Sequence, residues 1–471
     1  METHGEQIVA TKKLGPLTYL GYAAGDAGNN LAFAMVSMFL LLYYTDVAGI
    51  TAAAAGTLFL AVRAWDAFAD IFAGRIVDMT STRWGKFRPF ILFGSVPLLL
   101  LSMATFSVPA GWSAGWRLAY AFTTYALVGL AYSLVNIPYG SMAPAMTQVA
   151  EERARLAAFR SMGSGATVLM LAWVVAPQIK RYVGNPAGFQ QSLTFTTGIF
   201  VIVGFLLFLF TFLTCKEQVQ RDVASVSLKQ SMATLKTNMP LMMLCSTALL
   251  AITGTTAFST VGAYYARDVL LNANLFIWIT LVNTGVIFIV APLMPTIVHT
   301  IGKRNGYLIG GMLGIIGGVG MAFAPALVIA LIGAGIMGVG IAMLNTLMWA
   351  LEADTVEYGE WKTGVRTEGT TYALFSFTRK LGQAFGGAAA AFTLGLGGYI
   401  SANAGHQPES AQWAIRAACG LVPAGLFLLA ISVMFFYPLT EKKFREMVGD
   451  VAARRAEQKL KIHEEPPWWE S

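Results

Sequence analysis

Long apolar segments separated by short polar segments fill most of the chain. A helix that crosses a lipid bilayer needs about 20 consecutive, mainly apolar residues. Twelve segments reach about this length, near residues 17–44, 50–77, 88–108, 117–146, 155–179, 192–214, 238–266, 273–299, 305–324, 326–351, 368–398 and 411–437. The pattern predicts an all-α membrane protein with twelve transmembrane helices.

A polar segment near the middle of the chain divides these helices into two groups of six. It covers residues 216–237 and predicts a cytoplasmic linker. The expected domains are therefore an N-terminal six-helix bundle at 1–215, a C-terminal six-helix bundle at 238–437, and a cytoplasmic tail at 438–471 that is helical to about Lys461.

A weak internal repeat supports the two bundles. The run from Gly85 to Gly94 and the run from Gly302 to Gly311 share a glycine, a lysine, an aromatic residue and a final glycine at an offset of 217 positions. Parallel halves with matching turns are typical of transporters whose bundles rock against each other. Chance similarity between two glycine-rich turns is the alternative.

Composition and charge agree with a membrane location. Hydrophobic residues make up 56% of the 471 positions and charged residues 12%, about half the charged share of soluble domains. The formal net charge of +7 does not indicate nucleic-acid binding, because the basic residues sort by side. Twenty-two lie in segments on the expected cytoplasmic side, and four (Arg117, Lys180, Arg181 and Arg267) lie in outer loops. This asymmetry predicts that both termini are cytoplasmic.

Cysteine and histidine give no sign of a metal centre. Cys215, Cys245 and Cys419 have no metal-binding or disulfide spacing, and the four histidines are scattered towards loops and tails. The first 16 residues are polar and a long apolar segment follows them, which differs from a cleaved signal peptide.

Three charged residues share one face of the second predicted helix. Arg63, Asp66 and Asp70 stand at positions i, i+3 and i+7. A charge at bilayer depth costs about 3 kcal/mol on insertion scales, so such a face must look into a bundle or a wet cavity. A structural ion-pair cluster and a cation site both satisfy this requirement. The positions 217 residues later hold Thr280, Asn283 and Ile287, so the charges do not recur in the second half. A purely architectural cluster would be expected in both halves, and its absence from the second favours a cation site in the first.

Further polar side chains are expected in the same interior. They are Tyr22, Asp26, Asn29 and Asn30 in 17–44; Gly129, Tyr132, Ser133, Asn136 and Gly140 in 117–146; Arg160 in 155–179; and Ser376, Arg379, Lys380 and Gln383 in 368–398. The small residues alone are explained equally well by close helix packing. The charges are not, because unpaired buried charges would destabilise the fold strongly. Together they predict a cavity that contains both acids and bases.

Several motifs resemble one known family. They are Tyr43-Tyr-Thr-Asp-Val-Ala-Gly49, the run from Arg63 to Asp70, Arg83-Trp-Gly-Lys-Phe-Arg-Pro89, and the run from Glu352 to Glu360. These are similar to motifs of the glycoside–pentoside–hexuronide:cation symporters, which have the major facilitator fold. The resemblance covers essentially the whole chain. Within the family, the runs 136–141, 348–354 and 374–380 resemble the glucuronide-carrying subgroup.

The resemblance implies the cation-binding residues. Asp66 and Asp70 stand where the family has its cation-binding carboxylates. Ser133 stands where galactoside-carrying members have a threonine, and it retains the hydroxyl oxygen. Lys380 matches a lysine that lies near the cation site. The coupling ion is expected to be H+ or Na+, with no other metal and no cofactor.

The resemblance also implies the substrate-binding residues, which are Tyr22, Asp26, Tyr132, Asn136, Arg160, Ser376 and Arg379. Two positions depart from the galactoside-carrying members. Asn136 replaces an aspartate, which removes like-charge repulsion against a hexuronate. Gly140 replaces a tryptophan and leaves room for a bulky aglycone. Arg160 and Arg379 are both candidates for a bidentate pair with a substrate carboxylate, and spacing does not choose between them.

The implied function is cation-coupled symport of glucuronides or related hexuronide glycosides across the bacterial cytoplasmic membrane. The expected partners are an anionic sugar conjugate and membrane lipid, with no nucleic acid, and the protein is expected to act as a monomer. The loops around Arg83 to Arg88, Glu352 to Glu360 and Arg366 would form the inner gate. The alternatives are a symporter of a neutral glycoside or pentoside, an intramembrane hydrolase and a lipid carrier.

Overall fold

The computed structural model describes residues 14–80, 82–147, 149–217, 237–364, 368–441, 443–447 and 449–450. Over these residues the regular elements are helices, and the sole strand-like feature is an isolated bridge between Thr82 and Gly85. Eleven helical segments of the described chain are long and apolar enough to cross a membrane. The remaining predicted segment, 368–398, forms α14, a helix of 29 residues with a less apolar composition. The prediction of an all-α membrane protein is confirmed.

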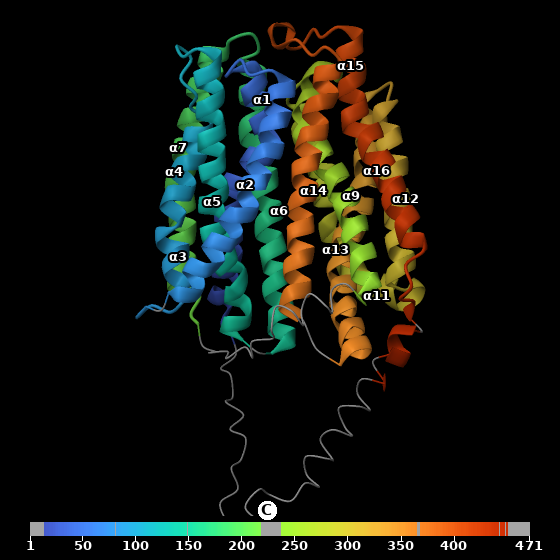
Figure 1. The fold of residues 1–471 in the computed structure, drawn as a ribbon. Coiled ribbons are helices and arrows are strands. Elements are labelled where there is room, and N and C mark those ends of the chain that lie inside the picture. The colour runs from blue at the N-terminus through green and yellow to red at the C-terminus, as the bar shows by residue number, and fades with distance from the viewer. Residues whose placement is uncertain are drawn as a thin grey trace, which may run out of the picture. The chain divides into compact units, whose positions relative to one another are not determined.

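Among the described residues, seven helices precede the central polar segment (Figure 1). They are α1 (Pro16–Asp46), α2 (Ala52–Met79), α3 (Arg88–Phe93), α4 (Ser95–Thr105), α5 (Ala114–Met146), α6 (Ala150–Arg181) and α7 (Pro186–Thr214). Side-chain caps mark the N-termini of two of these helices. The Thr51 hydroxyl accepts a hydrogen bond from the Ala54 amide at the start of α2, and the Asn185 side chain accepts one from the Gly188 amide at the start of α7. The predicted segment 88–108 is two helices rather than one, with Gly94 between them.

The helix α1 packs closely against α6 and α7 because glycines lie at the points of contact. A Cβ atom on Gly21 would lie 1.8 Å from the Thr214 hydroxyl, and one on Gly28 would lie 2.8 Å from the Phe208 ring. On α6, a Cβ on Gly163 would lie 2.4 Å from the Ala23 carbonyl of α1. The glycines therefore set the separation of these helices and place the polar side chains of α1 opposite α5 and α6.

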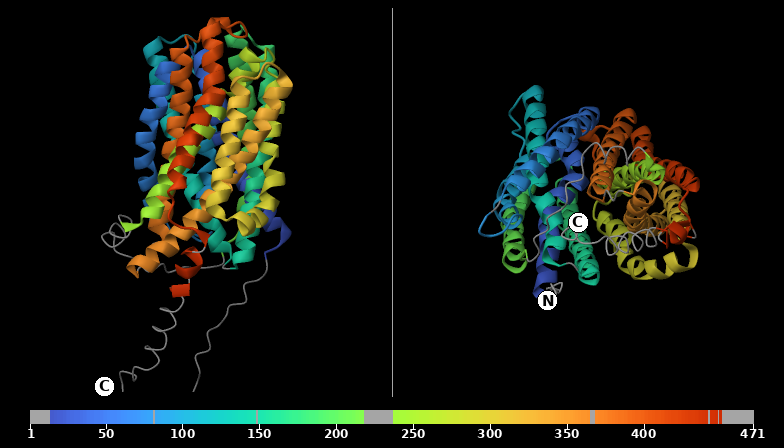
Figure 2. Two further views of the ribbon diagram at one scale, coloured as in Figure 1. Left: turned by 90° about the vertical axis from the view of Figure 1, so that its right-hand side faces the viewer. Right: turned by 60° about the horizontal axis from the view of Figure 1, so that its bottom comes forward.

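The later helices are α9 (Met239–Tyr264), α10 (Leu275–Gly285), α11 (Ile287–Ile301), α12 (Lys303–Ala322), α13 (Leu327–Thr363), α14 (Glu368–Leu396), α15 (Glu409–Arg416) and α16 (Val422–Phe435). Short π-helical turns η1 (Tyr265–Val269) and η3 (Ala417–Leu421) continue α9 and α15, and η2 (Ser401–Asn403) is a 3-10 turn. Figure 2 shows α12 and α13 running side by side, and glycines again allow it: a Cβ on Gly317 would lie 2.3 Å from the Met337 amide.

Two compact units emerge from the packing. The first contains the described part of residues 1–223 together with 263–280 and 398–411, and the second contains the described parts of 224–262, 281–397 and 412–471. The predicted linker lies almost wholly outside the described residues, as does the tail beyond residue 450. The bounds of the four segments predicted from the sequence stay predictions.

Two expectations about loops are wrong. The stretch from Glu352 to Glu360 is not a loop, because α13 continues to Thr363 and ends at Gly364, which adopts a left-handed conformation (φ +72°) that favours glycine. Arg267 is not in an exposed loop either, because it lies in η1 and is 5% exposed. Arg366, the third element of the predicted inner gate, lies outside the described residues.

The two halves of the predicted repeat share their turn geometry. Gly85 and Gly302 both have positive φ angles, +105° and +79°. In the first turn the Glu217 carboxylate accepts the amides of residues 86, 87 and 88 at 2.8–3.2 Å, and in the second the Glu441 carboxylate accepts the Lys303 amide at 3.2 Å. Each glutamate follows the last membrane helix of its half. Recurrence of both features argues against chance similarity of the two turns.

Candidate cation and substrate site

The two acids of α2 face α5 from adjacent turns. Asp66 is 7% exposed, and one of its oxygens lies 2.9 Å from Nη1 of Arg63. The Ser133 hydroxyl of α5 donates to Oδ1 of Asp70 at 2.5 Å and also contacts the Gly129 carbonyl at 3.0 Å. Two carboxylates, a hydroxyl and a main-chain carbonyl are thus gathered between two helices. Oxygen donors of this kind suit a proton or an alkali cation.

Gly129 allows this approach of α2 to α5. A Cβ atom at that position would lie 2.1 Å from Oδ1 of Asp66 and 3.1 Å from its carboxyl carbon. One turn earlier, the Trp65 indole donates to the Ala126 carbonyl at 3.0 Å and fixes the two helices in register. Asp66 therefore occupies the space that a side chain at position 129 would need.

We expect the substitution Gly129→Ala to displace the Asp66 carboxylate and to lower cation-driven accumulation of substrate at least about tenfold, since overpacking of this kind costs about 1–3 kcal/mol. The measurement is uptake into membrane vesicles under an imposed ion gradient. Gly115→Ala is the matched control, because a Cβ at Gly115 of the same helix meets nothing within 4 Å. Equal loss in both variants would mean that helix α5 tolerates no added methyl group and that Asp66 is not the cause.

The second part of the site joins α1 to α6. Arg160 Nε lies 2.8 Å from Oδ1 of Asp26, and Asn30 donates to the other Asp26 oxygen at 3.0 Å. The Asp26 side chain is 7% exposed, whereas that of Arg160 is 37% exposed. The guanidinium also lies over the Tyr139 ring, 5.3 Å from its centroid. Arg160 is thus held on one side and accessible on the other.

Aromatic rings border this pair. Tyr22 of α1 stacks on Tyr139 of α5 with ring centroids 4.7 Å apart, and Tyr132 of α5 stacks on Phe33 of α1 at 5.1 Å. The Tyr139 hydroxyl donates to the Tyr22 carbonyl at 2.5 Å. The structure therefore brings Tyr22, Asp26, Tyr132 and Arg160 together on facing helices.

Two asparagines offer hydrogen-bonding groups that the described protein atoms leave unused. Asn29 is 1% exposed, and neither its amide nitrogen nor its amide oxygen has a hydrogen-bond partner among the described residues. The same is true of Oδ1 of Asn136. Buried polar atoms of this kind normally have a partner, so they suit a hydroxylated ligand. From the sequence, Asn29 was placed among the polar residues of 17–44 but not among the substrate-binding residues. Its position three residues after Asp26, on the same side of α1, was the feature that could have indicated it.

The remaining predicted residues lie on α14. Ser376, Arg379 and Lys380 are half-buried there, and the Arg379 guanidinium lies over the Trp349 ring, 4.9 Å from its centroid. They belong to the second compact unit, and the cation and sugar contacts expected of them stay predictions. No group of three or more His, Cys, Asp or Glu side chains within the described ranges is arranged to hold a metal ion.

Comparison with known proteins establishes the family. Residues 21–441 match the model of the MFS/sugar transport protein family. The chain is 49% identical over 448 residues to the glucuronide carrier protein homolog of Escherichia coli (strain K12), covering 94% of this chain and 97% of that one. It is 33% identical to the isoprimeverose transporter of Lactiplantibacillus pentosus, over 93% and 91% of the two chains. A solved bacterial homolog of the human lysosomal transporter Spinster, inward-facing and unoccupied, shares the fold with a TM-score of 0.66 at 12% identity, over 91% of this chain and all of that one.

The chain belongs to the MFS/sugar transport protein family, and its resemblance to the glycoside–pentoside–hexuronide:cation symporters is confirmed. It is a multi-pass membrane transporter of the sugar symporter class and not an enzyme. The hydrolase alternative is therefore excluded.

Proposed function

We propose that the protein imports glucuronides or related hexuronide glycosides together with H+ or Na+. It does so as a monomer in the bacterial cytoplasmic membrane, surrounded by lipid, with both termini in the cytoplasm. The observation that carries the proposal is the state of Arg160, which is positioned by Asp26 but remains 37% exposed. The 49% identity to a protein named as a glucuronide carrier homolog supports the same substrate class.

Arg160 is suited to a carboxylate. Its contact with Asp26 uses Nε, which is one of five guanidinium N–H groups. The donors that remain form the planar fork that binds a carboxylate in bidentate fashion. Asn136 is neutral where an aspartate would repel such a group, and its unpartnered Oδ1 suits a sugar hydroxyl. Asn29 adds a second amide for the same purpose.

Coupling follows from the acids of α2. A proton or Na+ bound between Asp66 and Asp70 removes one unit of negative charge and weakens the pairing of that carboxylate with Arg63. Symport requires that the empty and the doubly loaded carriers interconvert readily while the singly loaded carrier does not. Two interacting carboxylates release protons in two separated steps, which suits H+. The Ser133 hydroxyl and the Gly129 carbonyl supply the additional oxygens that Na+ requires.

A symporter of a neutral glycoside or pentoside is the second candidate. It is favoured by the 33% identity to a protein named as an isoprimeverose transporter. Under this alternative the Asp26–Arg160 pair would bind sugar hydroxyl groups, with the carboxylate as acceptor and the guanidinium as donor.

Vesicles that contain the purified protein separate these candidates. We expect uptake of 4-nitrophenyl glucuronide above its external concentration when either a pH gradient or a Na+ gradient is imposed, one at a time. The matched neutral substrate is 4-nitrophenyl glucoside, which differs only at the carboxylate. Accumulation of the glucoside alone would establish the neutral-glycoside alternative, and movement of labelled phospholipid without either sugar would establish the lipid carrier. The ion whose gradient drives uptake identifies the coupling ion.

A further inference from the structure

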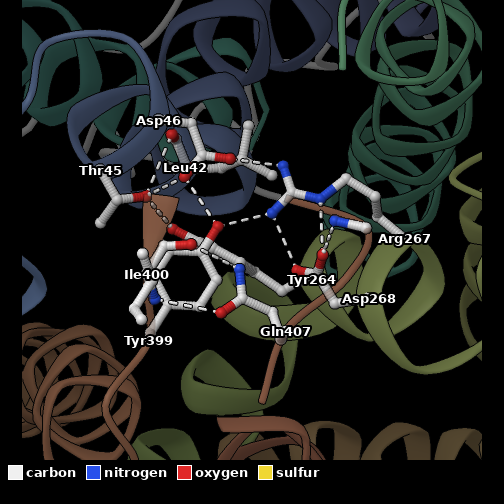
Figure 3. A network of polar contacts seen from close by, with 10 residues as sticks. Leu42, Thr45, Asp46, Tyr264, Arg267, Asp268, Tyr399, Ile400 and Gln407 are labelled. Atoms are coloured by element: carbon white, nitrogen blue, oxygen red, sulfur yellow. Dashed lines mark hydrogen bonds and ion pairs between the residues drawn. The ribbon is translucent and has the colours of Figure 1, made fainter. Parts of the chain in front are cut away.

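A second buried cluster of charges lies at the C-terminal end of α1, outside the site described above (Figure 3). Its members are Asp46, Arg267, Asp268 and Tyr399. Asp46 ends α1 within the motif Tyr43 to Gly49, Arg267 and Asp268 lie in η1, and Tyr399 follows α14. Neither the cation site nor the substrate site uses any of them.

Arg267 is the centre of the cluster. Its Nη1 contacts Asp46, its Nη2 and Nε contact the two Asp268 oxygens at 2.8 and 3.1 Å, and its Nη2 also donates to the Tyr399 hydroxyl at 2.6 Å. The Tyr399 hydroxyl in turn donates to Asp46 at 2.8 Å. Side-chain exposures are 5% for Arg267, 9% for Asp46 and 0% for Asp268. Burial raises the pKa of the Tyr399 phenol, so the hydroxyl stays protonated and remains a donor.

Neutral groups complete the cluster. The Thr45 hydroxyl lies 2.8 Å from both Oδ1 of Asp46 and the Tyr264 hydroxyl. The Gly405 amide donates to Asp268 at 2.7 Å. The segment 263–280 also meets α1 through Phe276, which packs edge-on against Phe39 with ring centroids 5.7 Å apart.

These contacts join segments that are far apart in the sequence. Residues 263–280 and 398–411 follow the central linker in the chain, but they form one compact unit with the helices that precede it. The Arg267–Asp46 ion pair and the Tyr399–Asp46 hydrogen bond connect those segments to α1. A buried charge whose partner is removed is strongly unfavourable, so the closed cluster requires all its ions at once. Arg267 and Asp268 lie in the same turn and remain paired when α1 moves away. Separation therefore breaks the contacts of Asp46 with Arg267 and Tyr399. Hydration of the separated groups recovers their desolvation cost and offsets the loss of these contacts.

We propose that Asp46, Arg267, Asp268 and Tyr399 form a latch that fastens segments 263–280 and 398–411 to α1 and that opens once in each transport cycle. The inference rests on the proposed function to the extent that a carrier with alternating access must separate its halves on one side and then on the other. Permanent attachment of the same segments, as plain architecture, is the alternative. The two differ in whether weakening the ions exposes the surfaces that they hold together.

Alkylation of a buried cysteine measures this exposure. Ala273→Cys is the reporter, because Ala273 is 3% exposed and lies in the segment whose Phe276 ring packs on α1. The full chain is reconstituted in lipid nanodiscs, and the rate of reaction with a charged maleimide is measured. The same protein without the reporter is the blank, since its three cysteines are buried. No substrate, coupling ion or membrane orientation enters the measurement, so its outcome is independent of whether the transported sugar is a glucuronide.

We expect Arg267→Met to accelerate alkylation of the reporter at least about tenfold, within the usual range of coupling between conformational states. Tyr399→Phe removes two hydrogen bonds and no charge, and a rise of about threefold is expected. Arg416→Met is the matched control, because Arg416 donates to the carbonyls of Ala322 and Ala324 and should leave the rate unchanged. Tyr399→Phe decides the question if Arg267→Met does not fold. Unchanged alkylation in a monodisperse Tyr399→Phe protein, or equal acceleration by Arg416→Met, would overturn the proposal.

Discussion

Concentrative uptake is expected to disappear when Asp66→Asn and Asp70→Asn are combined. The amides keep the size and hydrogen-bonding capacity of the side chains but carry no negative charge, so neither H+ nor Na+ is held and an ion gradient no longer does work on the substrate. Because the substitutions leave the Asp26–Arg160 pair intact, exchange of external for internal substrate should continue at a substantial rate. The measurements are accumulation and substrate exchange in the same vesicles.

The single variants and a control refine this result. Asp66→Asn alone should abolish accumulation, because Asp66 is the more deeply buried of the two acids and is paired with Arg63 at 2.9 Å. Glu409→Gln makes the same chemical change at an exposed carboxylate and should transport normally. Continued accumulation against a gradient by the double variant would show that the cation binds elsewhere.

Loss of Arg160 is expected to have the second large effect. Arg160→Met should weaken binding of 4-nitrophenyl glucuronide by roughly 10- to 150-fold, the equivalent of about 1.5–3 kcal/mol for hydrogen bonds to a charged group. Binding of the matched neutral glucoside should weaken less, because it offers no carboxylate to the guanidinium. Both affinities can be measured by calorimetry on the purified protein.

Stability must be separated from recognition in this experiment. Arg160→Met leaves the buried Asp26 carboxylate without its cation. This lowers the free energy of unfolding, but by less than for a fully buried pair, where the loss is about 3–5 kcal/mol, because Arg160 is 37% exposed and water screens the pair. Adding Asp26→Asn removes that charge, so the double variant should regain thermal stability but not glucuronide binding. Arg379→Met is the competing test, because Arg379 is the other candidate for the substrate carboxylate. If Arg379→Met is the variant that loses selectivity for the glucuronide, Arg379 makes this contact in place of Arg160.

Periodicity was sufficient to predict most of the fold. A bilayer requires long apolar helices, and the helix period alone puts Asp66 and Asp70 on one face. The failures have local causes. The last residues of α13 are mainly polar and do not repeat apolar residues at the helix period. Hydropathy therefore gave no sign that the helix continues to Thr363. The predicted span 88–108 is confirmed as the membrane-spanning segment Arg88–Thr105, and only its interruption at Gly94, a single residue within an apolar run, was missed.

The contacts of the site were less predictable than its residues. Asp26 and Arg160 are 134 positions apart, and nothing in their spacing shows that they form an ion pair. The close approach of Asp66 to Gly129 depends on the crossing of α2 and α5, which hydrophobic patterns do not determine. Arg267 follows the seventh predicted helix directly, so the sequence indicated an arginine in a loop. It is instead a buried cation, because Asp46 and Asp268 lie next to it in three dimensions.

The glutamates that bind the two glycine turns have a consequence for how this chain can be divided. Glu217 lies near the start of the linker and Glu441 near the start of the tail, so each glutamate directly follows the half whose glycine turn it completes. A cut placed after Glu217 leaves both closures within their own fragments, whereas a cut before it removes the acceptor of three amides from the fragment that needs it. The part of the linker beyond Glu217 can therefore change in length and sequence without cost to either turn.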